Sequence, residues 1–551
     1  MRAQIVVGLL ACLLQITTAE KTQLDPDLHR QLLLSGRPQV GLWQALMKQK
    51  QLESAVATSD STQHPFVTQD PTSIYEAHCF EQPLSHFDDS VNGTFCQRYW
   101  FDASAYKPGG PVFVLDGGET SGADRLPFLE KGIIQILANA TEGLAIVLEH
   151  RYYGESIPVP DLSTDNLRFL NNAESLEDSA YFIENFKPPA SLVDLVDESA
   201  LHPNNTPWIY YGGSYAGARA AHMRTQYPDI VWGAIASSAV THSQIIMPEY
   251  FDPIMQYGPE DCISTLQSTI QIIDKLLETP EPLPSLLKSF FGLPGLSNGD
   301  FGEVLQSPLG LWQAKNWDPA VGSEAFYGFC DALTAGGAAS QIGLVRIPAA
   351  VVNFAGYIKT EVVTTCPPGQ DEKSIQDCFG SDNDAKFQVT DLSQTWRLWL
   401  FQVCTQWGYF QIAPTDGPSI VSKFLDLEQG SKICRQAYPP GKYFTVPEWP
   451  DVEEINRRGD YGIAMDRLAF IDGDRDPWRP MTPGADIAPK RTSTVKRPVH
   501  IIFDGVHHYD ENGLTDHSAE PARIRDVHEL EVNFVSEWLE EWKEYKFSQS
   551  S

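Results

Sequence analysis

Residues 208–223 read WIYYGGSYAGARAAHM, and this stretch predicts a buried strand, a tight turn and a helix in direct succession. The apolar run WIYY is typical of a short buried strand, the glycine pair before Ser214 permits a sharp turn, and the small residues after it favour a helix. This is the setting of a nucleophile elbow, where crowding demands small neighbours and the serine hydroxyl points out of the sheet. The alternative is a glycine-rich turn with an ordinary serine, because Ala216 stands where the G-x-S-x-G pattern has glycine.

Apolar runs that alternate with helical stretches surround this segment. The strand-like runs are residues 111–116, 145–149 and 231–236, with an amphipathic segment at 126–138. Such alternation indicates a parallel sheet built by strand–helix–strand crossovers. Upstream, an N-G pair joins two further strand-like runs at 78–87 and 94–101, which predicts a hairpin that a disulfide between Cys79 and Cys96 could staple.

The alternation stops near residue 240 and resumes only near residue 460. Residues 241–459 contain helical pieces broken by loops rich in proline and glycine, together with six of the cysteines. Sheet-like runs return at 467–473 and 498–505, and an amphipathic helix is expected at about 521–545. We therefore expect an α/β fold whose two parts, residues 71–240 and 460–551, enclose a helical, disulfide-stapled insertion.

The bulk properties of the 551-residue chain indicate an exported protein. Residues 1–19 have the short apolar core and small terminal residues of a signal peptide, and no later stretch is apolar enough to span a membrane. Residues 20–70 are polar and are expected to form a propeptide or N-terminal arm. The formal net charge of -32 argues against nucleic acid as a partner, because phosphates require lysine and arginine.

The cysteines beyond residue 19 are even in number, which favours disulfides in an exported chain. They are Cys79, Cys96, Cys262, Cys330, Cys366, Cys378, Cys404 and Cys434. None forms a CxxC pair, so no zinc site is expected. Three sequons predict N-glycosylation, at Asn92, Asn139 and Asn204.

A serine nucleophile needs a histidine base and an acid that orients it, and two later loops offer both. The strand at 467–471 runs into DGDRDPW, and the strand at 498–503 runs into DGVHHYD. With Ser214 these loops provide the chain order serine, acid, histidine that α/β-hydrolases use. The residues alone leave the choices open: the base is one of His507 and His508, and the acid is one of Asp472, Asp474, Asp476 and Asp504.

Four motifs taken together, EHRYYGES at 149–156, GGSYAG at 212–217, DPW at 476–478 and GVHHYD at 505–510, resemble a known family. This is the serine peptidase family of lysosomal Pro-X carboxypeptidase and dipeptidyl peptidase II, which includes secreted fungal members. The resemblance spans about residue 79 to the C-terminal helix. It implies an α/β-hydrolase domain with a helical, disulfide-rich cap over the active site. It assigns Ser214 as nucleophile, Asp476 as acid and His507 as base, which leaves His508 a structural role.

Further site residues follow from the fold and the resemblance. The oxyanion hole needs two N–H donors. We assign one to Tyr215, which follows the nucleophile, and the other to a backbone group in Gly117-Gly118-Glu119 after the third strand, with Gly118 as the first choice. In the family, Trp478 corresponds to an aromatic wall for a proline ring; the alternative is a tryptophan that only packs the core. Glu119 is a candidate to bind a substrate amine.

Further expectations concern residues outside the triad. Glu149 and Arg151 are expected to form a buried ion pair beneath the site. Gln406 replaces the glutamate usual in the family segment CTQWGYFQ, which puts the substrate charge preference in question. The expected disulfides are Cys404 with Cys434, by position in the family, and Cys262 with Cys330 and Cys366 with Cys378, by proximity in the chain.

These observations predict a secreted serine peptidase that cleaves on the carboxyl side of proline, as an exopeptidase of either chain end. The alternatives are a prolyl endopeptidase of the same family, a vacuolar-type serine carboxypeptidase, and an inactive binding protein with this fold. Vacuole or lysosome is the alternative location, and a homodimer the alternative to a monomer. The expected partners are proline-containing peptides or proteins, not nucleic acid or membrane. No metal or cofactor is expected, because a triad supplies its own base.

Overall fold

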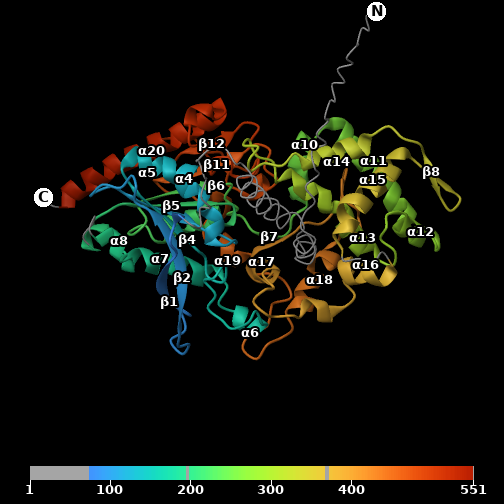
Figure 1. The fold of residues 1–551 in the computed structure, drawn as a ribbon, viewed down its shortest axis with the longest axis horizontal. Helices are drawn as coiled ribbons and strands as arrows, with labels where there is room; N and C mark the ends of the chain where they lie inside the picture. The colour runs from blue at the N-terminus through green and yellow to red at the C-terminus, as the bar shows by residue number, and fades with distance from the viewer. Residues whose placement is uncertain (1–73, 194–197, 367–370, 550–551) are drawn as a thin grey trace, which may run out of the picture.

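The computed structural model describes residues 74–193, 198–366 and 371–549. The predicted signal peptide (1–19) and N-terminal arm (20–70) lie outside the described residues. Figure 1 shows a sheet with its covering helices on the left and a group of helices, α10 to α16, on the right. None of the helices within the described ranges has both the length and the apolar character needed to cross a membrane.

The first part is built on one sheet, which has eight strands in the described residues, in the order β1-β2-β4-β3-β5-β6-β11-β12. The strands are β1 (His78–Pro83), β2 (Thr94–Asp102), β3 (Val112–Asp116), β4 (Leu144–Leu148), β5 (Trp208–Gly213), β6 (Gly233–Ser237), β11 (Leu468–Gly473) and β12 (Val499–Ile502). β2 runs antiparallel to β1 and β4, and the strands from β4 to β12 are parallel. This order identifies the α/β-hydrolase fold, and the predicted hairpin is confirmed.

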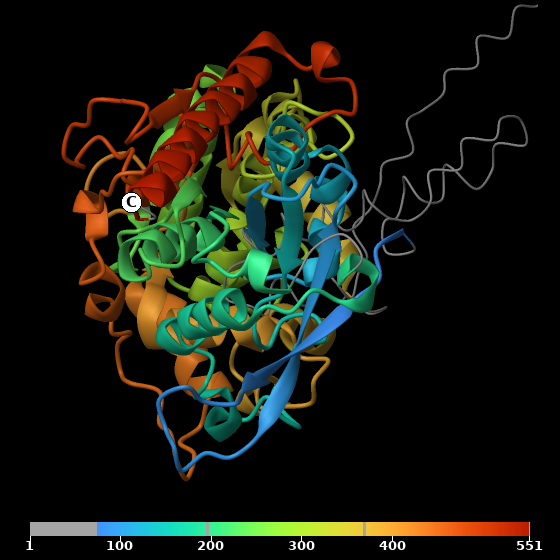
Figure 2. The same cartoon turned by 90° about the vertical axis from the view of Figure 1, so that its left-hand side faces the viewer.

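Helices cover both faces of the sheet, which explains why the central strands are apolar throughout. In β3, Phe113 and Leu115 join one core cluster while Val112 and Val114 join the other, as the alternation of a strand requires. The first face is covered by α4 (Pro127–Lys131), α5 (Ile133–Thr141) and α20 (Ala522–Gln549), and the second by α7 (Asn172–Asn185) and α9 (Tyr215–Gln226). The short helices α6 (Thr164–Leu167) and α8 (Ala190–Val193) flank α7. Figure 2 shows the long red helix α20 lying along one side of the molecule.

The amphipathic segment at 126–138 forms two helices instead of one continuous rod. Gly132 separates α4 from α5 in an extended conformation. A Cβ built on Gly132 would lie 2.7 Å from the carbonyl oxygen of Glu511, and the next N–H, that of Ile133, donates to that oxygen at 3.1 Å. The loop that carries the two histidines therefore packs against the break between α4 and α5.

The chain between β6 and β11 forms the cap. Its helices are α10 (Asp252–Tyr257), α11 (Glu260–Leu277), α12 (Leu283–Phe290), α13 (Asn298–Gln306), α14 (Ala325–Thr334), α15 (Ala349–Tyr357), α16 (Glu372–Phe379), α17 (Trp396–Gln402), α18 (Leu427–Ala437) and α19 (Glu453–Asn456). Two short ribbons pair β7 (Gln244–Ile246) with β10 (Gly408–Phe410) and β8 (Ser340–Ile342) with β9 (Val345–Ile347). One apolar cluster continues from the sheet into the cap, which seats the cap on the hydrolase part.

All of the predicted disulfide pairings are confirmed within the described residues. They are Cys79–Cys96 across the β1–β2 hairpin, and Cys262–Cys330, Cys366–Cys378 and Cys404–Cys434 in the cap. The cap bonds join α11 to α14, the α15–α16 connection to α16, and the segment after α17 to α18. Crosslinks of this kind stabilise a folded unit by restricting its unfolded chain.

Candidate active site

Ser214 lies at the sharp turn between β5 and α9. Its backbone has φ 62° and ψ -122°, a strained conformation for any residue except glycine. A Cβ on Gly212 would lie 2.0 Å from the carbonyl oxygen of Ala216, and one on Gly217 would lie 2.5 Å from that of Ser237. The glycines that the turn needs are therefore Gly212 and Gly217, which explains why Ala216 is tolerated. This is the geometry of a nucleophile elbow.

His507 and Asp476 are in direct contact. Nδ1 of His507 lies 2.9 Å from Oδ2 and 3.1 Å from Oδ1 of Asp476, and both side chains are buried. The N–H of Trp478 donates to Asp476 Oδ1 at 2.9 Å, which fixes the carboxylate. Burial would raise the pKa of Asp476, but the His507 contact lowers it below its usual value, while burial lowers the pKa of His507 in spite of Asp476. The pair is thus an ionised acid beside a neutral imidazole near neutral pH.

The other acid candidates lie in different surroundings. Asp504 forms an ion pair with Arg475 at 2.5 Å, and Asp474 is half-buried in the same loop region. Asp472 is buried beside Asp476, and burial together with the Asp476 charge raises its pKa to about 7. A carboxyl group that is half protonated at neutral pH is a poorer partner for an imidazolium than an ionised one.

His508 has partners of its own. Its Nδ1 lies 2.7 Å from Glu511 Oε2, and its N–H donates to Ser238 Oγ at 2.9 Å. Burial alone would lower the pKa of His508, but the Glu511 carboxylate raises it. A Cβ built on Gly213 would lie 3.2 Å from His508 Cγ, so the histidine loop packs directly against the turn that carries Ser214.

The sheet order explains how three distant loops meet. β5, β6, β11 and β12 are adjacent and parallel, so their carboxyl ends reach the same edge of the sheet. Ser214 follows β5, Asp476 follows β11 and His507 follows β12. The N–H of Ser214 also donates to the carbonyl of Ser237 at 2.8 Å, which ties the turn to the end of β6.

The two predicted oxyanion donors differ in whether their N–H groups are already hydrogen-bonded. Tyr215 is the first residue of α9, so its N–H has no acceptor within the helix. The prediction for Gly118 is corrected: its N–H donates to Asp116 Oδ1 at 2.9 Å and is already engaged. The next N–H along the chain, that of Glu119, is turned toward its own carboxylate. A Cβ on Gly118 would lie 3.3 Å from Ala216 Cβ, so this turn does pack on the nucleophile helix.

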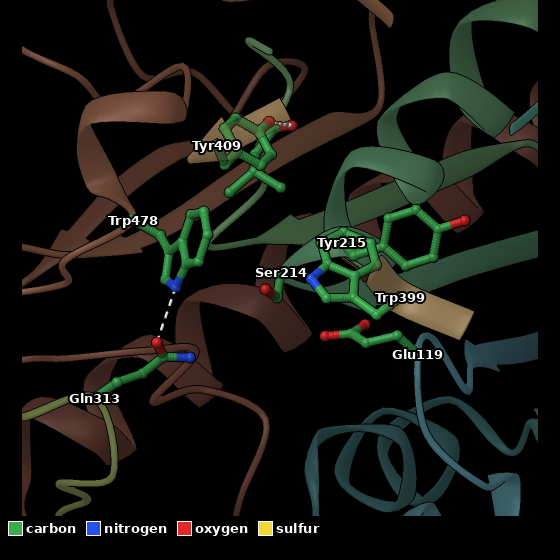
Figure 3. A pocket seen from close by; sticks show the side chains of 8 residues that line it. Glu119, Ser214, Tyr215, Gln313, Trp399, Tyr409 and Trp478 are labelled. Carbon is green, nitrogen blue, oxygen red and sulfur yellow. Dashed lines mark hydrogen bonds between the residues drawn. The ribbon is translucent and has the colours of Figure 1, made fainter. Parts of the chain in front are cut away.

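A pocket lies beside Ser214, with about 260 Å³ of empty space that includes open solvent (Figure 3). Its lining residues are Glu119, Ser214, Tyr215, Val240, Gln313, Trp399, Tyr409 and Trp478. Figure 3 shows the Ser214 hydroxyl between the Trp478 ring on one side and the Trp399 ring on the other, with the Glu119 carboxylate close by. The indole N–H of Trp478 donates to Gln313 Oε1 at 2.9 Å, which fixes this wall. The aromatic rings of Trp399, Tyr409 and Trp478 line the pocket together with one carboxyl group.

Sequence reasoning found Glu119 and Trp478 but missed the cap residues Gln313, Trp399 and Tyr409. Burial raises the pKa of Glu119, against the lowering by Arg125, and Glu119 carries the only ionisable carboxyl group among the lining residues described.

The expected ion pair beneath the site is wrong. Glu149 and Arg151 do not pair with each other: Glu149 accepts from Arg98 at 2.7 and 2.9 Å, and Arg151 donates to Asp178 at 2.5 and 2.7 Å. Arg98 lies on β2 and Asp178 lies on α7, so each residue takes its partner from another element of the fold. Gln406 lies outside the pocket lining, and its Oε1 accepts the N–H of Asn172 at the start of α7.

Comparison with known proteins identifies the family of the chain. The profile of the family described as serine carboxypeptidase S28 matches residues 82–529. The chain is 38% identical over 506 residues to a protein of Arthroderma benhamiae named "Probable extracellular serine carboxypeptidase", covering 86% of this chain and 69% of that protein. It is 26% identical over 498 residues to the serine protease vicPa of Bipolaris victoriae, covering 86% and 90%. It is 25% identical over 506 residues to the mouse thymus-specific serine protease, covering 87% and 90%. The chain belongs to the serine carboxypeptidase S28 family of serine peptidases.

Proposed function

We propose that this chain is an extracellular exopeptidase that hydrolyses peptide bonds on the carboxyl side of proline, with Ser214, His507 and Asp476 as its triad. The observation that carries the proposal is the pocket beside Ser214, which has aromatic walls and one buried carboxyl group. The aromatic walls suit an apolar ring, and a single buried charge suits the charged end of a chain.

The chemistry follows from the contacts. His507 is neutral and its Nδ1 is held by Asp476, so Nε2 takes the proton of the Ser214 hydroxyl as the oxygen attacks the peptide carbonyl. His507 then protonates the leaving amine, and water hydrolyses the acyl-enzyme by the same steps. The oxyanion is stabilised by the N–H of Tyr215 and by the N–H of Glu119, which replaces the occupied N–H of Gly118. When substrate binds, the N–H of Glu119 turns from the Glu119 carboxylate to the substrate oxygen.

Substrate selection is assigned to Trp478 and Glu119. Trp478 and the facing Trp399 provide the walls for the proline ring (Figure 3). Glu119, as a carboxylate, would bind the α-amino group of an N-terminal X-Pro dipeptide. In its protonated form, which its raised pKa favours at acid pH, it would donate to a C-terminal carboxylate. Both exopeptidase types therefore remain within the proposal.

The extracellular location rests on three observations. The 38% identical relative is named as extracellular, the described chain carries four disulfides, and residues 1–19 have the pattern of a signal peptide. The three sequon asparagines, Asn92, Asn139 and Asn204, are exposed and are proposed as N-glycosylation sites.

A peptide-library digest read by mass spectrometry tests the proposal. Loss of one residue after proline from the C-terminus would identify a Pro-X carboxypeptidase, and release of N-terminal X-Pro dipeptides a dipeptidyl peptidase. Cleavage of doubly blocked peptides would replace the proposal by an endopeptidase. Ser214→Ala should abolish turnover and fluorophosphonate labelling with the fold intact; labelling of that variant would contradict the assignment of the nucleophile.

A further inference from the structure

The phenol of Tyr215, directly after the nucleophile, is held between the two parts of the molecule. Its hydroxyl lies 3.0 Å from His150 Nε2 on the hydrolase side, and Gln402 Nε2 of the cap donates to it at 2.9 Å. The rings of Trp399 and Trp407, also from the cap, meet the phenol edge-on, with centroids 5.2 and 5.1 Å away. Tyr215 is therefore fixed on its polar end and on its faces.

The hydrogen bonds at this hydroxyl form a chain with one direction. Tyr153 Oη donates to Gln402 Oε1 at 2.6 Å, which turns the amide nitrogen of Gln402 toward Tyr215. At the other end, His150 Nδ1 lies 2.7 Å from the carbonyl oxygen of Arg151, which can only accept, so Nδ1 carries the proton. Burial lowers the pKa of His150 to about 3, so its Nε2 is bare and accepts from Tyr215.

Gln402 is the one member of this chain that comes from the cap. It ends α17, is fully buried, and precedes the π-helical turn Val403–Trp407, which the Cys404–Cys434 disulfide anchors to α18. The other members come from the EHRYYGES segment and from α9. Removing the cap would leave the Tyr215 and Tyr153 hydroxyls without the amide that joins them.

We propose that Gln402 is a positioning residue for the oxyanion site: through Tyr215 it holds the first N–H of α9 in place, so the site is complete only when the cap is seated. The inference rests on the proposed role of the Tyr215 N–H. Its physical reason is the strain at Ser214, whose φ of 62° persists only where the surroundings hold it. The side chain of the next residue, pinned at its far end, is such a constraint.

The test compares three variants with the wild-type chain. Gln402→Leu keeps the volume and removes both hydrogen bonds, and Tyr153→Phe removes only the donor that orients the amide. Gln436→Leu is the matched control, because Gln436 is another buried cap glutamine whose amide bonds Ser381 and Asp384, within the cap. For each, we would measure the second-order rate of inactivation by a fluorophosphonate, and kcat and KM on the best peptide from the library.

We expect Gln402→Leu to lower the inactivation rate and kcat about 10-fold to 100-fold, less than the roughly 10²–10³ lost when an oxyanion donor is removed outright. KM should stay within about twofold, because the pocket walls remain. Tyr153→Phe should lower the inactivation rate and kcat by a smaller factor, and both values for Gln436→Leu should match those of the wild type. A purely structural role would instead lower the melting temperature and leave the rates of the folded enzyme unchanged.

Equal inactivation rates for Gln402→Leu and wild type, or a change confined to KM, would overturn the inference. If Gln402→Leu does not fold, Tyr153→Phe decides, and an unchanged kcat in that variant is the refuting result. The fluorophosphonate does not depend on proline, so the two failures are distinguishable. A wild-type chain that resists the reagent refutes the proposed function and this inference with it, whereas a labelled wild type with an equally labelled variant refutes only the inference.

Discussion

Replacing Asp476 by asparagine should reverse the tautomer of His507. Oδ1 of Asp476 accepts the N–H of Trp478 at 2.9 Å, so the amide oxygen of the asparagine must take that position. The amide nitrogen then takes the Oδ2 position, 2.9 Å from His507 Nδ1, and donates to it. Nδ1 becomes an acceptor, and the single proton of the neutral imidazole moves to Nε2. A protonated Nε2 cannot take the proton of Ser214.

The expected loss is about 10³–10⁴-fold in kcat, which corresponds to about 4–5.5 kcal/mol of barrier. KM should change little, since Asp476 lies behind the histidine and outside the pocket lining. The assay is steady-state hydrolysis of a proline peptide, with fluorophosphonate inactivation as a second reading of the nucleophile.

Asp472→Asn is the matched control for this variant. Asp472 is the buried carboxyl group beside Asp476, and its raised pKa makes the neutral amide a close mimic of its protonated form. Its kcat at neutral pH should stay within about threefold of wild type, as expected for an isosteric change away from the reacting groups. A loss in Asp476→Asn of less than tenfold, or an equal loss in both variants, would refute the tautomer argument and reopen the choice of acid.

Three further predictions concern stability and specificity. The pKa of Asp472 is raised to about 7 in the folded chain from 3.8, so between these pH values the folded chain keeps a proton that the unfolded chain loses. As the pH rises from about 4 to about 7, the free energy of unfolding should therefore fall by up to about 1.4 kcal/mol per pH unit. Urea unfolding of Asp472→Asn should lack this slope, and identical slopes in the two proteins would contradict the assignment. Glu119→Gln should raise KM at least about tenfold for peptides with the preferred free terminus, because one buried charge–charge contact is worth about 1.4 kcal/mol or more. The KM for peptides with blocked termini should not change. Equal effects on free and blocked peptides would exclude a role of Glu119 in binding the charged terminus. Trp478→Phe loses the hydrogen bond to Gln313 and part of a wall, so kcat/KM for proline substrates should fall about 10-fold while non-proline controls change less; a uniform fall would indicate a packing role only.

The local pattern carried most of the fold. Residues 208–223 predicted a buried strand, a turn and a helix, and these are β5, Ser214 and α9, because short apolar strands between two helical layers leave a strong signal. The sequence pattern did not decide which of two adjacent histidines is the base. Nothing in periodicity says whether His507 or His508 turns toward an acid from another loop, and His508 takes a backbone with φ 35° that no pattern indicates. The resemblance named His507, and the Asp476 contact favours that choice.

The errors concern contacts between segments far apart in the chain. The expected Glu149–Arg151 pair is wrong because Arg98 on β2 and Asp178 on α7 approach these residues only after the sheet and its helix have packed. The pocket residues missed in the cap are similar. Gln313 and Trp399 lie 86 residues apart, in an insertion without regular periodicity, and only the seated cap brings both to Ser214.

The contacts of Asp116 show how the turn that carries the proposed oxyanion donor Glu119 is fixed. The N–H of Gly118 is engaged because Asp116 uses it to fix the turn, with Oδ1 accepting that N–H and Oδ2 accepting from Arg219 Nε at 2.7 Å. Arg219 lies on α9, one helical turn after Tyr215, so Asp116 joins the turn before Glu119 to the helix that begins at Tyr215. The two proposed donors, the N–H groups of Tyr215 and Glu119, thus belong to one rigid unit of the hydrolase part. Gln402 holds the first residue of α9 from the side of the cap. A glycine whose own N–H is occupied therefore still shapes the site, because it determines where the next N–H points.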